Sequence, residues 1–133
     1  MSTIPDIAHV AVTVSDYEVS LAWYTKLFGR DPDLDEDTGP FRHTIWAQPN
    51  GQLFAFHTFP AGVFKPGRAD ELTPGLDHIG FLVASRGDLE DWAKKLDDLG
   101  IEHGKIVDAS YGSGLAFRDP DNIQLEFFAP PAG

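Results

Sequence analysis

The sequence predicts an α+β protein made of two copies of a βαβββ module. The first observation behind this prediction is that the same order of strand-like and helix-like segments occurs twice along the chain. The second is that His9 and His78 occupy matching places, 69 residues apart, in the first strand of each copy. The 133 residues fit one domain, with modules at about 1–66 and 67–133. One helix on a short sheet leaves sheet edges open, so the modules are expected to pack together or to pair across a dimer.

The first module begins with an expected strand at 7–14, where β-branched residues alternate with small or polar ones. Ser15 and Asp16 are candidates for the N-cap of a helix at 17–28. Gly29 then stands where a C-cap glycine is common. Weaker strand candidates follow at about 30–36, 41–48 and 52–59.

The second module repeats this order. A strand is expected at 76–83, followed by an amphipathic helix at 88–99 that Gly100 closes. Three further strands are expected at about 101–107, 111–118 and 122–129. The acid-rich segment 119–122 is interpreted as a β-turn rather than a metal loop, because proline at its second position and asparagine at its fourth suit that geometry.

Composition excludes several classes of protein. The chain has 21 acidic and 10 basic residues, a formal net charge of -11 that disfavours binding to nucleic acids or anionic membranes. It has no apolar run long enough for a membrane span and no secretion signal at its start, so a cytoplasmic protein is expected. Because cysteine is absent, any metal ion must be bound by imidazole and carboxylate groups.

Three side chains are candidate metal ligands. His9 and His78 share the strand face opposite the one that packs on the helices, and each is followed two positions later by a small residue. Glu126 lies between apolar neighbours in the last strand, where a carboxylate is costly unless it is paired or bound to a cation. Two imidazoles and one carboxylate on three strands can form a facial triad with open coordination positions. The alternative for each histidine is a hydrogen-bonded structural role.

The repeat also suggests a fourth ligand. His57 lies 69 residues before Glu126, which makes it the expected counterpart of Glu126 in the first module. A slip of one residue in strand register would instead turn His57 to the other face. Nitrogen and oxygen donors of this kind suit one divalent transition ion, namely Fe²⁺, Mn²⁺, Co²⁺, Ni²⁺ or Zn²⁺. His43 and His103 are interpreted as surface or loop residues.

Several residues are expected to contact a small-molecule substrate. Phe59 and Phe128 share the ligand-facing parity of their strands and could form an apolar wall. The other candidates, near strand ends, are Trp46, Tyr111 and Arg118. For Arg118 the sequence leaves two partners open, Asp121 or a carboxylate of the substrate.

The two βαβββ modules and the segment Phe117-Arg-Asp-Pro-Asp-Asn-Ile-Gln-Leu-Glu126 resemble the vicinal oxygen chelate superfamily, the group of glyoxalases, bleomycin-resistance proteins and extradiol dioxygenases. The resemblance implies a half-open mixed β-barrel, a homodimer, and a metal site formed by His9, His78 and Glu126. Glyoxalase I relatives have a glutamate where this chain has His57. A His-His-Glu set is more similar to the extradiol dioxygenases or the fosfomycin-modifying enzymes, and the phosphonate-binding basic cluster expected of the latter is not evident.

The expected activity is therefore that of a metal-dependent enzyme acting on a small oxygen-bearing molecule. Dioxygenase-type chemistry with Fe²⁺ is favoured. The alternative enzyme is a glyoxalase-like lyase or isomerase in which Glu126 moves a proton as the catalytic group. A metal-free protein that sequesters an antibiotic or metabolite, and a regulatory dimer with a vestigial site, remain as non-enzymatic alternatives. The sequence leaves open whether the site forms within one chain or across a dimer.

Overall fold

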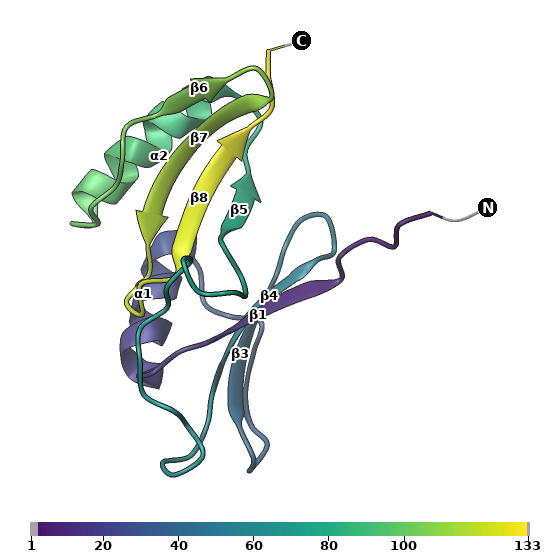
Figure 1. Ribbon diagram of the computed structural model, residues 1–133, viewed down its shortest axis with the longest axis vertical. Coiled ribbons are helices and arrows are strands. Elements are labelled where there is room, and N and C mark those ends of the chain that lie inside the picture. The colour runs from purple at the N-terminus through teal and green to yellow at the C-terminus, as the bar shows by residue number, and fades with distance from the viewer. Residues whose placement is uncertain (1–2, 133) are drawn as a thin grey trace. The chain divides into compact units, whose positions relative to one another are not determined.

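The computed structural model describes residues 3–132 and divides the chain into two units, unit 1 ending at Pro66 and unit 2 starting at Gly67 (Figure 1). Unit 1 contains β1 (His9–Thr13), α1 (Tyr17–Phe28), β2 (Leu34–Asp37), β3 (Arg42–Ala47) and β4 (Leu53–Thr58). Unit 2 contains β5 (Ile79–Leu82), α2 (Arg86–Asp98), β6 (Val107–Ala109), β7 (Gly112–Arg118) and β8 (Gln124–Ala129). The predicted α+β class and the βαβββ order are confirmed.

Both units have the same sheet topology. The strand order is β1-β4-β3-β2 in unit 1 and β5-β8-β7-β6 in unit 2. The first and last strands of each unit run parallel, whereas the remaining pairs are antiparallel. The helix between the first two strands of a unit provides the long crossover that a parallel pair requires.

Local sequence signals determine where the helices begin and end. Asp16 caps α1 by accepting a hydrogen bond from the backbone N–H of Val19, and Gly29 ends the helix at a φ of 72°. Ser85 and Asp88 form a capping box at the start of α2, which explains why this helix begins two residues before the predicted position 88.

Each sheet has one face covered by a helix and one open face. In unit 1 the buried residues of the covered face are Val12, Thr44, Trp46, Phe54 and Phe56, together with Tyr24 and Leu27 of α1, and the Tyr24 ring packs on Trp46, Phe54 and Phe56. In unit 2 it carries Phe81, Leu115, Phe117, Leu125 and Phe127, together with Leu89 and Leu96 of α2. Since neighbouring residues of a strand point to opposite faces, this core fixes which side chains lie on the open face.

The strand predicted at 101–107 is wrong for most of its length. The N–H of Ile101 bonds back to the carbonyl of Leu96 in α2, so this segment completes the end of the helix instead of starting a strand. His103 makes a single bridge with Phe117, and the edge strand β6 starts only at Val107. The corresponding edge strand of unit 1, β2, is exposed throughout, in keeping with its acidic sequence.

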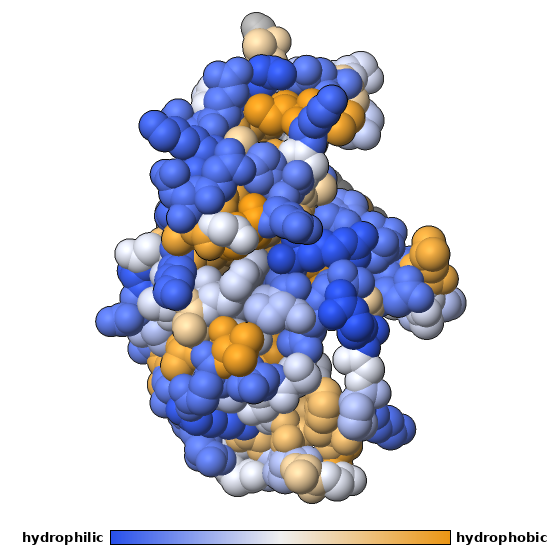
Figure 2. Space-filling view, turned by 90° about the vertical axis from the view of Figure 1, so that its left-hand side faces the viewer, coloured by the Kyte–Doolittle hydropathy of each residue, from blue (hydrophilic) through white to orange (hydrophobic). Residues whose placement is uncertain are grey.

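The surface shown in Figure 2 is largely hydrophilic, interrupted by separate apolar areas, in keeping with the acidic composition. No helix within residues 3–132 has the length and apolar character needed to cross a membrane.

His103 was predicted to be a surface or loop residue. It does lie in the segment between α2 and β6, but only 17% of its side chain is exposed and both ring nitrogens have partners. Its Nδ1 lies 2.7 Å from the carbonyl oxygen of Gly104, and its Nε2 lies 2.8 Å from Oδ1 of Asp97 in α2. Both partners are acceptors, so only the doubly protonated ring satisfies both. The hydrogen bonds to Gly104 and Asp97 accordingly raise the pKa of His103.

We expect the contribution of His103 to stability to depend on pH. Because its pKa is raised on folding, this contribution is complete below the ordinary histidine pKa of about 6.5 and is lost as pH rises through the folded value. The variant His103→Gln should lose at most about 1 kcal/mol, since Asp97 is exposed, and the loss should be larger at about pH 5.5 than at about pH 8.5. Urea unfolding at the two pH values measures this. An equal loss at both would contradict the assignment.

Candidate functional site

Glu126 lies on the open face of sheet β5-β8-β7-β6 in a cradle of small residues. Its ladder partners are Gly80 on β5 and Ala116 on β7. A Cβ atom added at Gly80 would lie 3.5 Å from Oε1 of Glu126, and one added at Gly114 would lie 3.1 Å from Oε2. The side chain is 27% exposed, and within residues 3–132 its carboxylate accepts no hydrogen bond. A half-buried carboxylate left without a donor is a good candidate to bind a cation.

His78 faces this carboxylate from the start of β5. Its Nε2 lies 3.8 Å from Oε1 of Glu126, and its Nδ1 lies 2.7 Å from Oδ1 of Asp77. Two of the three predicted ligands therefore lie side by side within unit 2. Asp77 was not predicted as a site residue, although a carboxylate directly before a candidate ligand histidine is a usable signal.

An apolar strip continues along the same face beyond Glu126. Leu82 is the ladder partner of Phe128, and the ring of Tyr111 stacks on that of Phe128 at 6.5 Å with an interplanar angle of 13°. Leu82 and Tyr111 are 76% and 74% exposed. Gly112 makes room for the Phe128 ring, because a Cβ atom there would lie 2.3 Å from Cζ of Phe128.

The open face of unit 1 carries three histidines, with Glu36 of β2 paired to one of them. His9 lies at the start of β1, and His57 on β4 is the ladder partner of His43 on β3. The rings of His43 and His57 contact each other at 5.3 Å, and Phe41 stacks on His57 at 4.8 Å. Burial lowers the pKa of His57, and the neighbouring His43 and His9 lower it further, so His57 is neutral near pH 7.

The predicted equivalence of His57 and Glu126 is wrong by two residues. Glu126 is paired with Gly80, whose counterpart in unit 1 is Ala11, and Ala11 is paired with Ala55. His57 is paired with Thr13 instead. A difference of two residues leaves a side chain on the same face of the sheet, so His57 still lies on the open side. Its position in the repeat, however, no longer supports the prediction that it is a metal ligand.

His43 was expected to be a surface or loop residue, yet only 17% of its side chain is exposed. Its Nε2 lies 3.7 Å from Oε1 of Glu36 on the edge strand β2. The alternation of β3 provides the missing signal, because Thr44 and Trp46 face the core and therefore place His43 on the open face.

The remaining predicted substrate contacts are less favourably placed. Trp46 is buried on the covered face of unit 1, where its indole N–H donates to the carbonyl of Arg30. Arg118 forms two hydrogen bonds with Glu71 at 2.8 and 2.9 Å, a partner that the sequence did not suggest. These bonds lower the pKa of Glu71 to about 2. Phe59 follows β4 directly and has its ring 6.4 Å from that of His57.

The predicted turn at 119–122 is confirmed. The N–H of Asn122 bonds to the carbonyl of Asp119, and Asn122 has a φ of 71°. The carboxylate of Asp119 accepts hydrogen bonds from the backbone N–H groups of Asp121 and Ile123, so it stabilises the turn.

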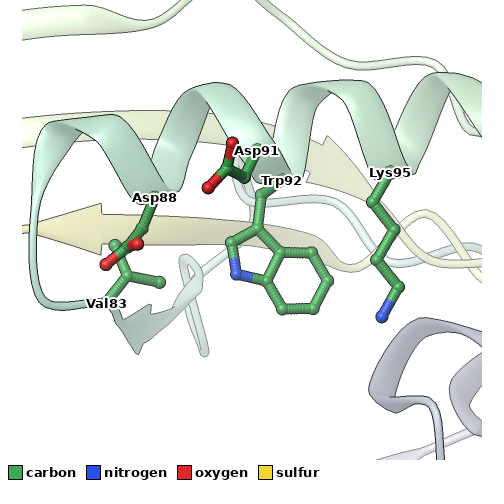
Figure 3. Close-up of a pocket in the computed structure, with 5 residues that line it drawn as sticks. All are labelled: Val83, Asp88, Asp91, Trp92 and Lys95. Carbon is green, nitrogen blue, oxygen red and sulfur yellow. The ribbon is translucent and has the colours of Figure 1, made fainter.

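A hollow of about 360 Å³ lies on the helix side of unit 2 (Figure 3), where it is lined by Val83, Asp88, Asp91, Trp92 and Lys95. Trp92 stacks on Phe127, which belongs to the covered face of the sheet. The hollow is therefore separated from Glu126 by the sheet itself. Within residues 3–132, no group of three or more histidine, aspartate or glutamate side chains is arranged to hold a metal ion.

Comparison with known proteins agrees with this architecture of two βαβββ units, each with one open sheet face. Residues 6–127 match the family described as the Glyoxalase/Bleomycin resistance protein/Dioxygenase superfamily, and the chain belongs to this superfamily. A solved glyoxylase/bleomycin resistance protein/dioxygenase domain from Frankia sp. EAN1pec is 28% identical with a TM-score of 0.85, covering 97% of this chain and 100% of that one.

Two curated relatives differ in their named activities. The biphenyl-2,3-diol 1,2-dioxygenase 3 of Rhodococcus globerulus is 29% identical over 98% of this chain and 68% of its own length. The metallothiol transferase FosB of Bacillus licheniformis is also 29% identical, over 90% of this chain and 72% of its own length. The chain is equally similar to two relatives whose named activities differ. These similarities agree with the superfamily but do not identify the reaction.

We expect Gly112→Ala to be strongly destabilising. The new Cβ atom would lie 2.3 Å from Cζ of Phe128 and 2.5 Å from the backbone oxygen of Ala129, at a φ of 143°. The cost should be roughly 2–4 kcal/mol, because neither the backbone oxygen nor the strained φ can relax easily. Gly104→Ala is the matched control, since a Cβ atom there meets only one atom, at 3.8 Å. Equal urea midpoints for the two variants would show that the Phe128 ring does not need this glycine.

Proposed function

We propose that this protein is a divalent-metal-dependent enzyme that acts on a small substrate with two adjacent oxygen atoms, with dioxygenase-type chemistry favoured. The observation that carries this proposal is the pairing of His78 with Glu126 on the open face of unit 2. There the carboxylate has no hydrogen-bond donor among residues 3–132, and glycines keep the space beside it free. The similarity to a biphenyl-2,3-diol 1,2-dioxygenase also supports dioxygenase-type chemistry.

The donor set fits a first-row divalent ion. His78, directly before β5, and Glu126 on β8 would supply one nitrogen and one oxygen ligand, and His9 of unit 1 is proposed as the third ligand on the basis of the sequence pattern. When bound, such an ion, Fe²⁺ in the favoured case, acts as a Lewis acid on the adjacent oxygens of a substrate and, if redox-active, allows reaction with dioxygen.

The protein's own groups then have distinct roles. Glu126 holds negative charge at the site and can accept or return a proton when it is not fully engaged as a ligand. His57 is neutral near pH 7, so it can accept a proton from a substrate hydroxyl. We therefore propose His57 as an acid–base group, with the role of fourth ligand as the alternative.

The apolar strip beyond Glu126 indicates the kind of substrate. Leu82, Phe128 and Tyr111 present a flat apolar surface on the face that carries the carboxylate. Planar rings bind well to such surfaces by stacking and by burying apolar area. We propose an uncharged aromatic or similarly flat substrate. An anionic substrate is disfavoured, because the guanidinium of Arg118 is already held by Glu71.

We expect the purified protein to contain, or to take up, about one equivalent of a divalent transition metal per site. His9→Ala, His78→Ala and Glu126→Ala should each reduce binding strongly while circular dichroism shows an intact fold. His103→Ala is the histidine control and should bind normally. Retained metal in the His78 or Glu126 variant would refute the site, and stoichiometric ligand binding by metal-free protein would favour the sequestration alternative.

His57→Ala separates the two roles proposed for this residue. If His57 transfers protons, the variant should keep its metal while turnover of a catechol probe falls about 10²–10⁴-fold. If His57 is a ligand, metal content itself should fall. Metal analysis and oxygen consumption on the same sample distinguish the two results, and unchanged values for both would remove His57 from the site.

The predicted homodimer can be measured on the same material by light scattering.

A further inference from the structure

The carboxylate of Asp77 contacts the imidazole of His78 directly. Its Oδ1 lies 2.7 Å from Nδ1 of His78, on the side of the ring away from Glu126. A carboxylate can only accept a hydrogen bond, so this contact requires the proton to be on Nδ1. In the neutral ring, Nε2 is then left with a free lone pair on the side of Glu126.

His78 needs such a partner because the backbone does not fix its ring. It directly precedes β5, whose ladder begins only at Ile79, and its side chain is 45% exposed. Within residues 3–132, Asp77 makes no other hydrogen bond, so its carboxylate is not committed elsewhere. The equivalent position in unit 1, before His9, is Ala8, which has no polar side chain. The contact is thus specific to the histidine beside Glu126.

We propose that Asp77 is a positioning residue that holds His78 in the Nδ1–H tautomer and directs the lone pair of Nε2 toward the space beside Glu126. The part of this inference that concerns metal affinity rests on the metal site of the proposed function. A hydrogen bond from a ligand imidazole to a carboxylate fixes the ring and increases its basicity, and loss of such a partner typically costs 10–100-fold in metal affinity. Because the side chain of Asp77 is 72% exposed, we expect the lower end, about tenfold.

Long-range ¹H–¹⁵N NMR of the metal-free protein tests the tautomer without any activity assay. At about pH 8, above the ordinary histidine pKa of about 6.5, His78 should show an Nδ1–H ring in the wild type and a mixture of both tautomers in Asp77→Ala. Asp77→Asn keeps an acceptor oxygen and should restore most of the Nδ1–H form. Asp91→Ala removes the same charge from the surface of α2 and should leave the His78 signals unchanged.

Calorimetric titration with Zn²⁺ or Co²⁺ provides the second readout. Asp77→Ala should bind about tenfold more weakly than the wild type, Asp77→Asn should lie between them, and Asp91→Ala should match the wild type. An unchanged tautomer in Asp77→Ala would overturn the inference, and so would a changed tautomer with unchanged affinity. If the wild type binds no metal but the tautomer responds as expected, Asp77 does orient His78 and it is the proposed function that fails.

Discussion

The parallel pairing of the first and last strands is the constraint on which each unit depends. It places both strands beside each other under one crossover helix, and the apolar residues that face the helix decide which residues remain on the open side. In unit 2 this pairs the start of β5 with the first half of β8, so His78, directly before β5, lies 3.8 Å from the carboxylate of Glu126. The candidate chemistry therefore follows from the same alternation that builds the core.

The two open faces have become chemically different. Unit 2 combines the central carboxylate of Glu126, one imidazole and an apolar strip, whereas unit 1 carries three imidazoles and aromatic rings, with Glu36 only on its edge strand. Glycines at 80 and 114 leave room around Glu126, while Phe41 and His43 crowd His57. Crowding removes water from the His57 ring and favours its neutral form, whereas the open cradle leaves Glu126 accessible. A common fold thus presents an accessible carboxylate on one sheet and a crowded imidazole of lowered pKa on the other.

Much of the fold was predictable because its signals are local. The helix caps, the strand alternation and the turn at 119–122 each depend on residues a few positions apart. Features that depend on residues far apart in the chain were harder to predict from the sequence. The register of β4 could not be derived from a constant repeat spacing, and the partner of Arg118 is 47 residues away. The strand prediction at 101–107 was wrong for another reason. The apolar residues of this segment are typical of a strand, but the backbone N–H of Ile101 is hydrogen-bonded to the carbonyl of Leu96 at the end of α2.

The two residues by which the units differ in spacing have a consequence for how such a duplicated fold can diverge. The N-caps Asp16 and Ser85 are 69 residues apart, whereas Gly29 and Gly100, which follow the helices, are 71 apart, so the extra residues belong to the segment of α2 and its end. The strands that follow pair in the same way in both units. Chain length can therefore change outside the sheet while every strand residue keeps its face. Ala55 occupies the place where the other unit has its acid, so a ligand position can be absent from one unit while the core stays intact.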